Sequence, residues 1–314
     1  MNFTRIQLPG HLQTGPSLKI GTTWLLHESV FGLFLVITWL RLVVALGPTN
    51  PYALVFLACL IGAIAVQRWT QRDPTPLRWR IRLLFYPAVM GVSFFILEHA
   101  IPALGVPRAD SLLLAWDRAL FGETPSITYM ARDHPWLNDG LMLAYLFFFY
   151  YLILVPAHYC ICDLRRFRKC FAGLFTIYGI SLLCYTLLPA GGPHLHLAFA
   201  DPLEGPFVIR WALAPINVAS NGVDVFPSVH FAASFYLLVF DWWHYRRRFW
   251  WYVLPCVALW FATVLLRFHY LVDLLAGLVV ALVGLAFAWW HERRMSRGEN
   301  VTSSDDAARL PTAA

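Results

Sequence analysis

Two short segments that contain histidines carry the residue types needed to break a phosphate ester. The first runs from Phe226 to His230 and reads FPSVH, and the second runs from Arg267 to Asp273 and reads RFHYLVD. His269 and Asp273 are four residues apart, so they share one face if the second segment is helical. A carboxylate in that position holds an imidazole in one tautomer and raises its nucleophilicity.

Together these side chains could divide the work of a phosphoryl transfer. Ser228 predicts a helix N-cap, and the free amides at a helix start favour an anion such as phosphate. Arg267 would supply a charged clamp for the phosphate oxygens. His269 would attack phosphorus with Asp273 behind it, and His230 would protonate the leaving oxygen. This phosphohistidine chemistry needs no metal, and we expect neither a metal site nor a cofactor.

Three further polar residues lie between positions 189 and 229, a region rich in Pro, Gly and His. We predict that Arg210 binds a second phosphate oxygen, that Asp224 contacts the hydroxyls of an acceptor, and that His194 contacts a head group. The alternative interpretations are a solvated loop charge for Arg210, turn chemistry for Asp224 and a loop-shaping role for His194.

The composition indicates an integral membrane protein. Of the 314 residues, 59% are hydrophobic and 13% are charged, and the mean hydropathy is +0.59. Soluble domains carry about 25% charged residues. The formal net charge of +6 comes mostly from arginines that flank apolar stretches. We interpret it as membrane-flanking charge and expect no nucleic-acid partner.

Eight apolar stretches reach or approach the roughly 20 residues that a helix needs to cross the hydrocarbon core. The second and the sixth stretch are the short ones. We therefore predict an all-α, polytopic transmembrane bundle with about eight spans. The stretches are Trp24–Leu46, Tyr52–Gln67, Leu83–Leu104, Leu137–Cys160, Cys170–Leu188, His230–Trp243, Phe249–Leu266 and Tyr270–Trp290.

The basic residues are distributed unequally between the two sides of this bundle. If the N-terminus is cytoplasmic, 18 of the 24 Lys and Arg residues lie on the inner side, 5 on the outer side and Arg41 within the first span. Such a bias predicts cytoplasmic N- and C-termini. It also places both histidine segments at the outer face. Because 22 of these residues are arginines, we expect a bacterial inner membrane with the site facing the periplasm or exterior.

The long connections fall on the outer side and divide the chain. Residues 105–136 include Asp117–Gly122, part of an amphipathic segment that we expect to lie in the membrane interface. We predict N-terminal transmembrane helices over residues 1–109, a catalytic membrane domain over 110–291 and a disordered cytoplasmic tail over 292–314.

The motifs resemble those of a known family. Pro227–His230 resembles the P-S-x-H motif of the type 2 phosphatidic acid phosphatase superfamily, and Arg267–Asp273 resembles its third motif. The family's phosphatase branch usually has the arginine six positions before the histidine, whereas here it is two before. The compact H-Y-x-x-D form and Asp117–Gly122 are similar to the inositol phosphorylceramide synthase-like branch. The family's first motif, a lysine followed by Arg-Pro, is absent.

This resemblance covers residues 110–291 and implies a six-helix phosphatase-type core. It implies His269 as nucleophile, Asp273 as its partner, and His230 as general acid and then base. It further implies a phospholipid or sphingolipid-like substrate in the bilayer, with inositol, another polyol or water as acceptor.

We therefore expect a lipid phosphotransferase that forms a phosphohistidine. The alternative is a phosphatase acting on a lipid phosphate or a polyprenyl phosphate or diphosphate. An alternative of another class, a non-enzymatic membrane carrier or a haem protein, would leave Ser228, Arg267 and Asp273 without a role. Nothing in the sequence sets the lipid donor, the acceptor or the oligomeric state.

Overall fold

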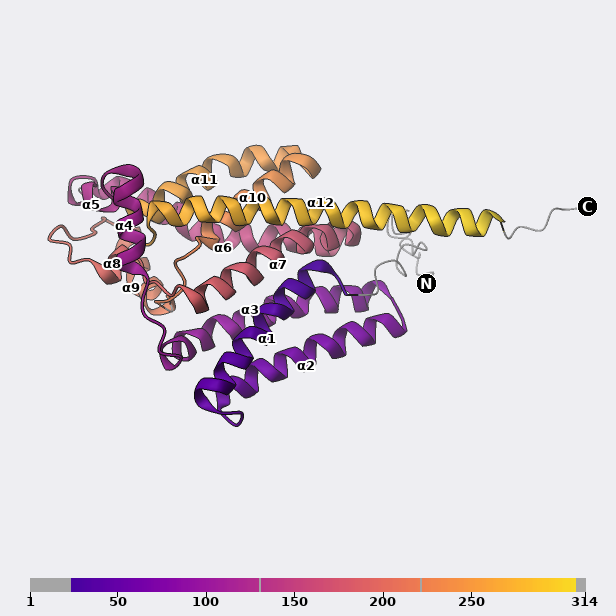
Figure 1. Ribbon diagram of the computed structural model, residues 1–314. Helices are drawn as coiled ribbons and strands as arrows, with labels where there is room; N and C mark the ends of the chain where they lie inside the picture. Colours follow the sequence, from indigo (N-terminus) through magenta and orange to yellow (C-terminus); the bar gives the residue numbers. More distant parts are fainter. Residues whose placement is uncertain (1–23, 130, 221, 309–314) are drawn as a thin grey trace, which may run out of the picture.

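The computed structural model describes residues 24–129, 131–220 and 222–308, and this part of the chain folds into helices joined by loops (Figure 1). Seven of its helices are long and apolar enough to cross a membrane. The expected all-α polytopic bundle is thereby confirmed. The seven are α1 (Leu26–Leu46), α2 (Pro51–Arg72), α3 (Pro76–Ala103), α6 (Pro135–Cys162), α7 (Leu164–Leu187), α11 (Arg246–Leu265) and α12 (Leu271–Ala308).

The remaining long helix, α10 (Val229–His244), has 16 residues and corresponds to the sixth predicted stretch. At 1.5 Å per residue it is roughly 24 Å long, which is less than the roughly 30 Å of a hydrocarbon core. It packs against α7, α11 and α12. Its first turn carries His230, so the helix begins at the histidine site.

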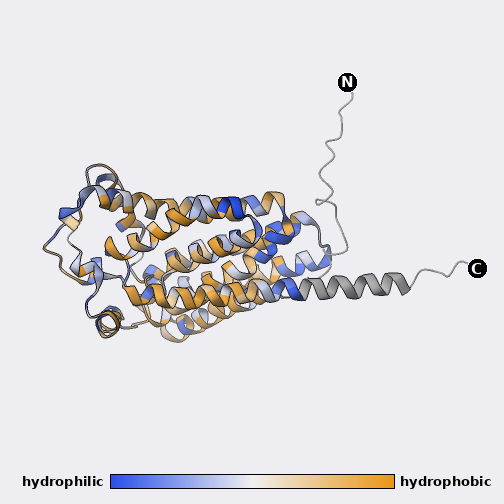
Figure 2. Ribbon diagram, turned by 90° about the horizontal axis from the view of Figure 1, so that it is seen from above, coloured by the Kyte–Doolittle hydropathy of each residue, from blue (hydrophilic) through white to orange (hydrophobic). Residues whose placement is uncertain are grey.

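Short helices and loops form the end of the bundle at which α12 begins (Figure 1). We call residues 105–134 and 188–228 the outer cap, after the side on which the charge count predicts these connections. It contains α4 (Asp110–Phe121), α5 (Pro125–Thr128), a 3-10 turn (Ala131–Asp133), α8 (Pro193–His196) and α9 (Val208–Ala219). Figure 2 shows apolar residues along the middle of the bundle and polar ones toward its two ends.

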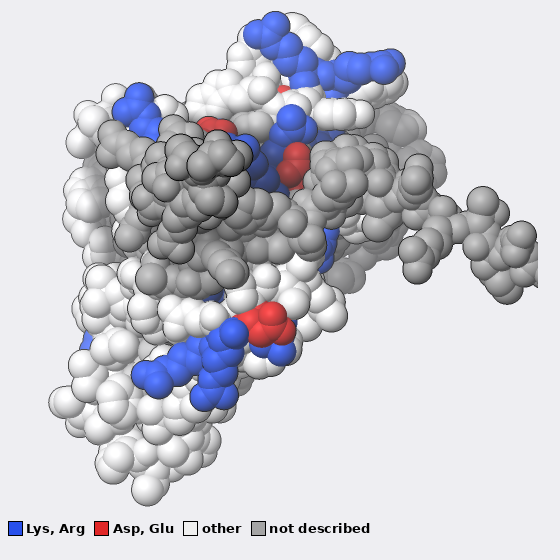
Figure 3. Space-filling model, turned by 90° about the vertical axis from the view of Figure 1, so that its right-hand side faces the viewer, with Lys and Arg blue, Asp and Glu red and all other residues white. Residues whose placement is uncertain are grey.

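The opposite end, where α1 begins, is rich in basic residues. Figure 3 shows Lys and Arg side chains spread over this face, with few acidic ones among the described residues. Some are paired: Arg78 lies 3.3 Å from Asp73, and Lys169 lies 2.5 Å from Glu292. The arginine-rich connections therefore lie together, as the charge count predicted.

Two features differ from or refine the predicted organisation. The helices α1 to α3 share one hydrophobic core with α6, α7, α10, α11 and α12. A disordered tail was expected from residue 292, whereas the described helix α12 continues to Ala308. Glu292 is held by Lys169, and extending an existing helix avoids the cost of nucleation. Residues 309–314 lie outside the described residues.

Candidate active site

The first histidine segment forms the start of α10. The Ser228 hydroxyl accepts a hydrogen bond from the Phe231 amide at 3.3 Å, so the predicted N-cap is confirmed. His230 is the second residue of the helix and is partly exposed. Its ring lies 4.8 Å from that of Tyr145 and 4.7 Å from that of Phe148, measured between centroids. Both aromatic residues come from α6, which therefore forms one wall of the site.

The second segment forms the tight turn between α11 and α12. The Thr263 carbonyl accepts hydrogen bonds from the amides of Phe268 (3.0 Å) and His269 (2.8 Å). Arg267 has φ = 71°, a left-handed conformation that non-glycine residues seldom adopt. The Tyr270 amide donates to Asp273 Oδ2 at 2.9 Å. The turn is thus fixed on both sides of His269.

The two segments bring the predicted catalytic side chains together. His230 Nδ1 lies 3.2 Å from His269 Nε2, although the residues are 39 positions apart. On the other side of the ring, His269 Nδ1 lies 3.4 Å from Asp273 Oδ2. This second distance exceeds that of a well-formed hydrogen bond, so the contact is mainly electrostatic. His269 and Asp273 are buried, and His230 is the member of the row that reaches solvent.

The surroundings of His269 favour its neutral form. Burial lowers the pKa of the imidazole well below its usual value, and the nearby His230 and His194 lower it further. The Val225 carbonyl opposes this shift. A neutral ring keeps a lone pair on the nitrogen that faces His230, as nucleophilic attack requires.

A glycine allows α12 to approach α10 closely enough for this contact. A Cβ atom added at Gly277 would lie 2.7 Å from the Ser228 carbonyl oxygen. Gly277 follows Asp273 by one helical turn, and the Ser228 amide donates to the Asp273 carbonyl at 3.1 Å. The backbones of the two helices therefore touch where the histidines meet.

Two buried aspartates on α4 hold the loops around the site. Asp117 accepts hydrogen bonds from the amides of Leu271 (3.0 Å) and Val272 (2.8 Å), so it caps the start of α12. Asp110 accepts from the Gly192 amide at 2.9 Å and from the Tyr270 hydroxyl at 3.2 Å.

Neither carboxylate was predicted as a site residue. The available signal was their spacing of seven residues, which places both on one face of a helix. Instead of lying only in the membrane interface, α4 packs across the start of α12.

Arg267 points into the outer cap. Its guanidinium donates to the Asp201 carbonyl at 2.6 Å, lies 3.2 Å from the Asp201 carboxylate and covers the ring of Phe199 at 3.9 Å. Its Nε is buried without a hydrogen-bond partner among the described residues. The predicted phosphate clamp thus holds the 199–201 loop in this structure, and its contact with phosphate stays a prediction.

His194 and Asp224 both lie beside the histidine pair. The amide and the Nδ1 of His194 lie 2.9 Å and 3.2 Å from the Arg267 carbonyl. Asp224 forms an isolated parallel bridge with Ala190, and burial raises the pKa of its carboxyl to about 6. Asp224 is also within electrostatic range of Tyr145, which packs on His230. Their predicted roles as substrate contacts stay predictions.

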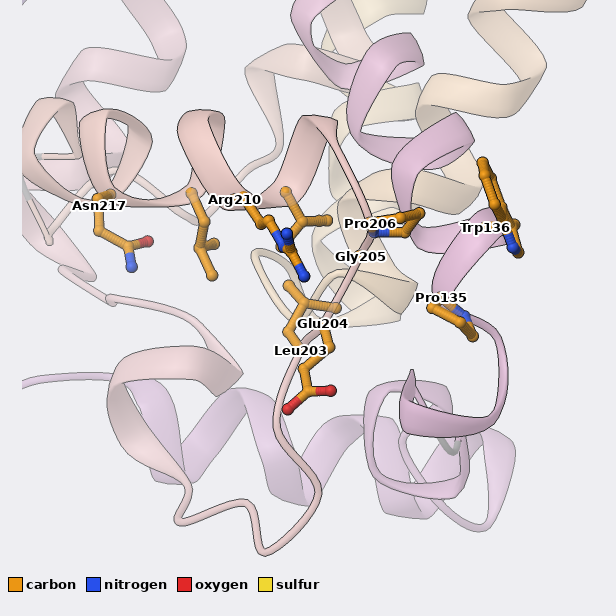
Figure 4. A pocket seen from close by; sticks show the side chains of 11 residues that line it. Pro135, Trp136, Leu203, Glu204, Gly205, Pro206, Arg210 and Asn217 are labelled. Carbon is orange, nitrogen blue, oxygen red and sulfur yellow. The ribbon is translucent and has the colours of Figure 1, made fainter.

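Arg210 lies on α9 and lines a separate pocket of about 690 Å³ (Figure 4). Glu204 and Asn217 also line it, and Trp136 borders it from the start of α6. Asp139 fixes this end of α9, because its carboxylate accepts hydrogen bonds from the amides of residues 207 and 209 at 2.7 and 2.9 Å. No contact in the described part of the chain joins Arg210 to the histidine pair.

The site contains several groups able to bind an anion or move a proton. Within residues 24–129, 131–220 and 222–308, no three or more His, Cys, Asp or Glu side chains converge in a way that could hold a metal ion. The donor set of two histidines and one carboxylate in a row suits proton transfer and nucleophilic attack.

A family model described as the PAP2 superfamily matches residues 111–287, which is more than half of the chain. The match includes both histidine segments and the α4 aspartate that caps α12, and it begins one residue after Asp110. In the comparisons with curated proteins and with solved structures, nothing matches.

Proposed function

Because this chain belongs to the PAP2 superfamily, we propose that it is a lipid phosphotransferase that works through a phosphohistidine at the outer face of a membrane. The superfamily suggests an enzyme of the phosphatase or phosphotransferase type. The observation that carries the finer proposal is the row His230–His269–Asp273, with contacts of 3.2 Å and 3.4 Å.

In the first half-reaction His269 is the nucleophile. Its Nε2 lone pair attacks phosphorus and the P–O bond to the leaving alcohol breaks. His230, whose protonated form the bound phosphate anion favours, gives its proton to the leaving oxygen. The positive charge that develops on the His269 ring is stabilised by Asp273. Nδ1 of His230 lies 3.2 Å from Nε2 of His269, so a phosphate that displaces this direct contact has its phosphorus beside Nε2 and its leaving oxygen beside Nδ1.

In the second half-reaction the acceptor oxygen attacks the phosphohistidine, and His230 acts as a base instead of an acid. Neutral His230 takes the proton of the acceptor hydroxyl, the acceptor oxygen attacks phosphorus, and the P–N bond to His269 breaks. An alcohol such as inositol or another polyol gives transfer. Water in the same position gives hydrolysis, so a phosphatase of lipid phosphates or polyprenyl (di)phosphates is the alternative that uses the same side chains.

His230, His269 and Asp273 lie at the end of the bundle that the outer cap covers. This position supports a reaction with a lipid substrate that reaches the site from the outer side of the bilayer. Phe207 and Trp211 of the cap and Trp136 at the start of α6 are exposed apolar side chains, which suit a membrane–water interface. The basic end of the bundle lies opposite. We propose the periplasmic or external face of a bacterial inner membrane for the site.

The test is to follow a labelled phosphate from a lipid phosphodiester or monoester, with and without inositol or glycerol. Transfer of label to the alcohol, absent in His269→Ala and His230→Ala, is expected. Release of inorganic phosphate that no alcohol redirects would replace transferase by phosphatase. His158→Ala, a histidine at the inner end of α6, is the matched control and should retain full activity. Full activity in His269→Ala would refute both versions.

A further inference from the structure

Arg108 is a charged side chain of the outer cap that the mechanism above does not use. Its Nε donates to Asp110 Oδ2 at 3.0 Å, and its Nη2 donates to the Gly222 carbonyl at 2.9 Å. Asp110 is buried, whereas 51% of the Arg108 side chain is exposed. These two contacts hold one edge of the guanidinium and fix its orientation. The other N–H groups of the guanidinium face solvent.

Two glycines connect this guanidinium with the nucleophile. A side chain at Gly191 would overlap Arg108 Nη2, and a side chain at Gly192 would overlap the carbonyl oxygen of Phe268. Gly192 also has φ = 85°, which favours glycine. Phe268 immediately precedes His269. Arg108 and the catalytic turn therefore pack on neighbouring residues of one short loop.

His194 lies two residues after Gly192, in α8, and has a polar atom without a hydrogen-bond partner among the described residues. Its Nδ1 faces the Arg267 carbonyl at 3.2 Å, an arrangement that assigns the proton of the neutral ring to Nδ1. Its Nε2 is buried and has no hydrogen-bond partner among the described residues. The charges of Arg108 and Asp110 both act on this ring, and the ring in turn acts on His269.

We propose that Arg108 and His194 form an anion-binding entrance that holds the non-reacting oxygens of the substrate phosphate on the outer side of His269. The planar guanidinium matches phosphate geometry, and Asp110 positions it. An anion beside His194 favours protonation of its ring, so Nε2 then donates a hydrogen bond. This inference rests on the proposed function in one respect only, namely that the ligand is a phosphate ester.

The test compares Arg108→Gln and Arg108→Lys with Arg118→Gln. Arg118 is the matched control, since it lies on α4, which begins two residues after Arg108, is similarly exposed and pairs with Glu123 at 3.4 Å. The full-length protein in detergent is titrated with inorganic phosphate, and KM and kcat are measured with a lipid phosphate. Loss of a charge-assisted contact predicts a ten- to hundredfold rise in Kd and KM for Arg108→Gln. Partial recovery is expected in Arg108→Lys and no change in Arg118→Gln.

Phosphate affinity equal to that of the wild type in Arg108→Gln would overturn the inference, as would a loss of kcat and thermal stability with an unchanged Kd. The phosphate titration does not depend on turnover. Phosphate binding by the wild type and its loss in Arg108→Gln, without turnover of any lipid phosphate, would refute the proposed function and support the entrance.

Discussion

Replacing Asp273 by Asn removes the charge behind the nucleophile while preserving the shape of the side chain. Asp273 Oδ2 lies 3.4 Å from His269 Nδ1 and accepts the Tyr270 amide at 2.9 Å. An amide oxygen can still accept that backbone bond, so the turn before α12 should survive. The variant therefore tests electrostatics rather than folding.

The size of the effect follows from the distance. Two unit charges 3.4 Å apart interact by about 5 kcal/mol at an effective dielectric constant of about 20. The His269 ring carries positive charge in the transition state and in the phosphohistidine, but not in the free enzyme. Most of this energy therefore acts on the barrier. At 1.36 kcal/mol per factor of ten, we expect kcat to fall by about 10³.

The assay is steady-state release of labelled phosphate or transfer product from a lipid phosphate, with the melting temperature measured on the same preparation. KM and melting temperature should stay near the wild-type values. Glu123→Gln, an exposed carboxylate of the outer cap, is the matched control and should leave kcat unchanged. A kcat for Asp273→Asn within tenfold of the wild type would refute the electrostatic role.

Two other predictions concern helix contact and protonation. Gly277→Val should lower kcat and reduce stability by about 1–3 kcal/mol. Even the first added carbon would lie 2.7 Å from the Ser228 carbonyl oxygen and would force α12 away from α10. Unaltered kcat and melting temperature would contradict the close packing. The pH profile of kcat/KM should have its acidic limb below pH 6.5, because burial lowers the pKa of His269 from that ordinary value and the neutral ring is the reactive form. An acidic limb above pH 6.5 would show that a different group limits the reaction.

Much of the catalytic row could be predicted from the sequence, because its determinants are local. The turn at His269 and Asp273 spans five residues, and Ser228 caps the helix that carries His230. The distribution of arginines then placed both segments on one side of the bundle. The lengths of the apolar stretches predicted the seven long helices, and the sixth stretch corresponds to the 16-residue helix α10.

The supporting contacts could not be predicted, because each joins distant parts of the chain. Asp117 caps residues 154 and 155 positions away, and Arg108 reaches a carbonyl 114 positions away. In the sequence alone, such residues are indistinguishable from charged residues of a loop or of the membrane interface. The direction of the Arg267 side chain could not be predicted either, because it contacts Asp201, 66 positions away, from a left-handed backbone conformation.

The central claim is that His269 becomes covalently phosphorylated. Rapid acid-free quenching after addition of a labelled lipid phosphate, followed by peptide mapping under alkaline conditions, locates the modified residue directly. The proposed mechanism predicts label on His269 in the wild type and none in His269→Ala. Turnover by the wild type with label on another residue, or label that persists in His269→Ala, would contradict it.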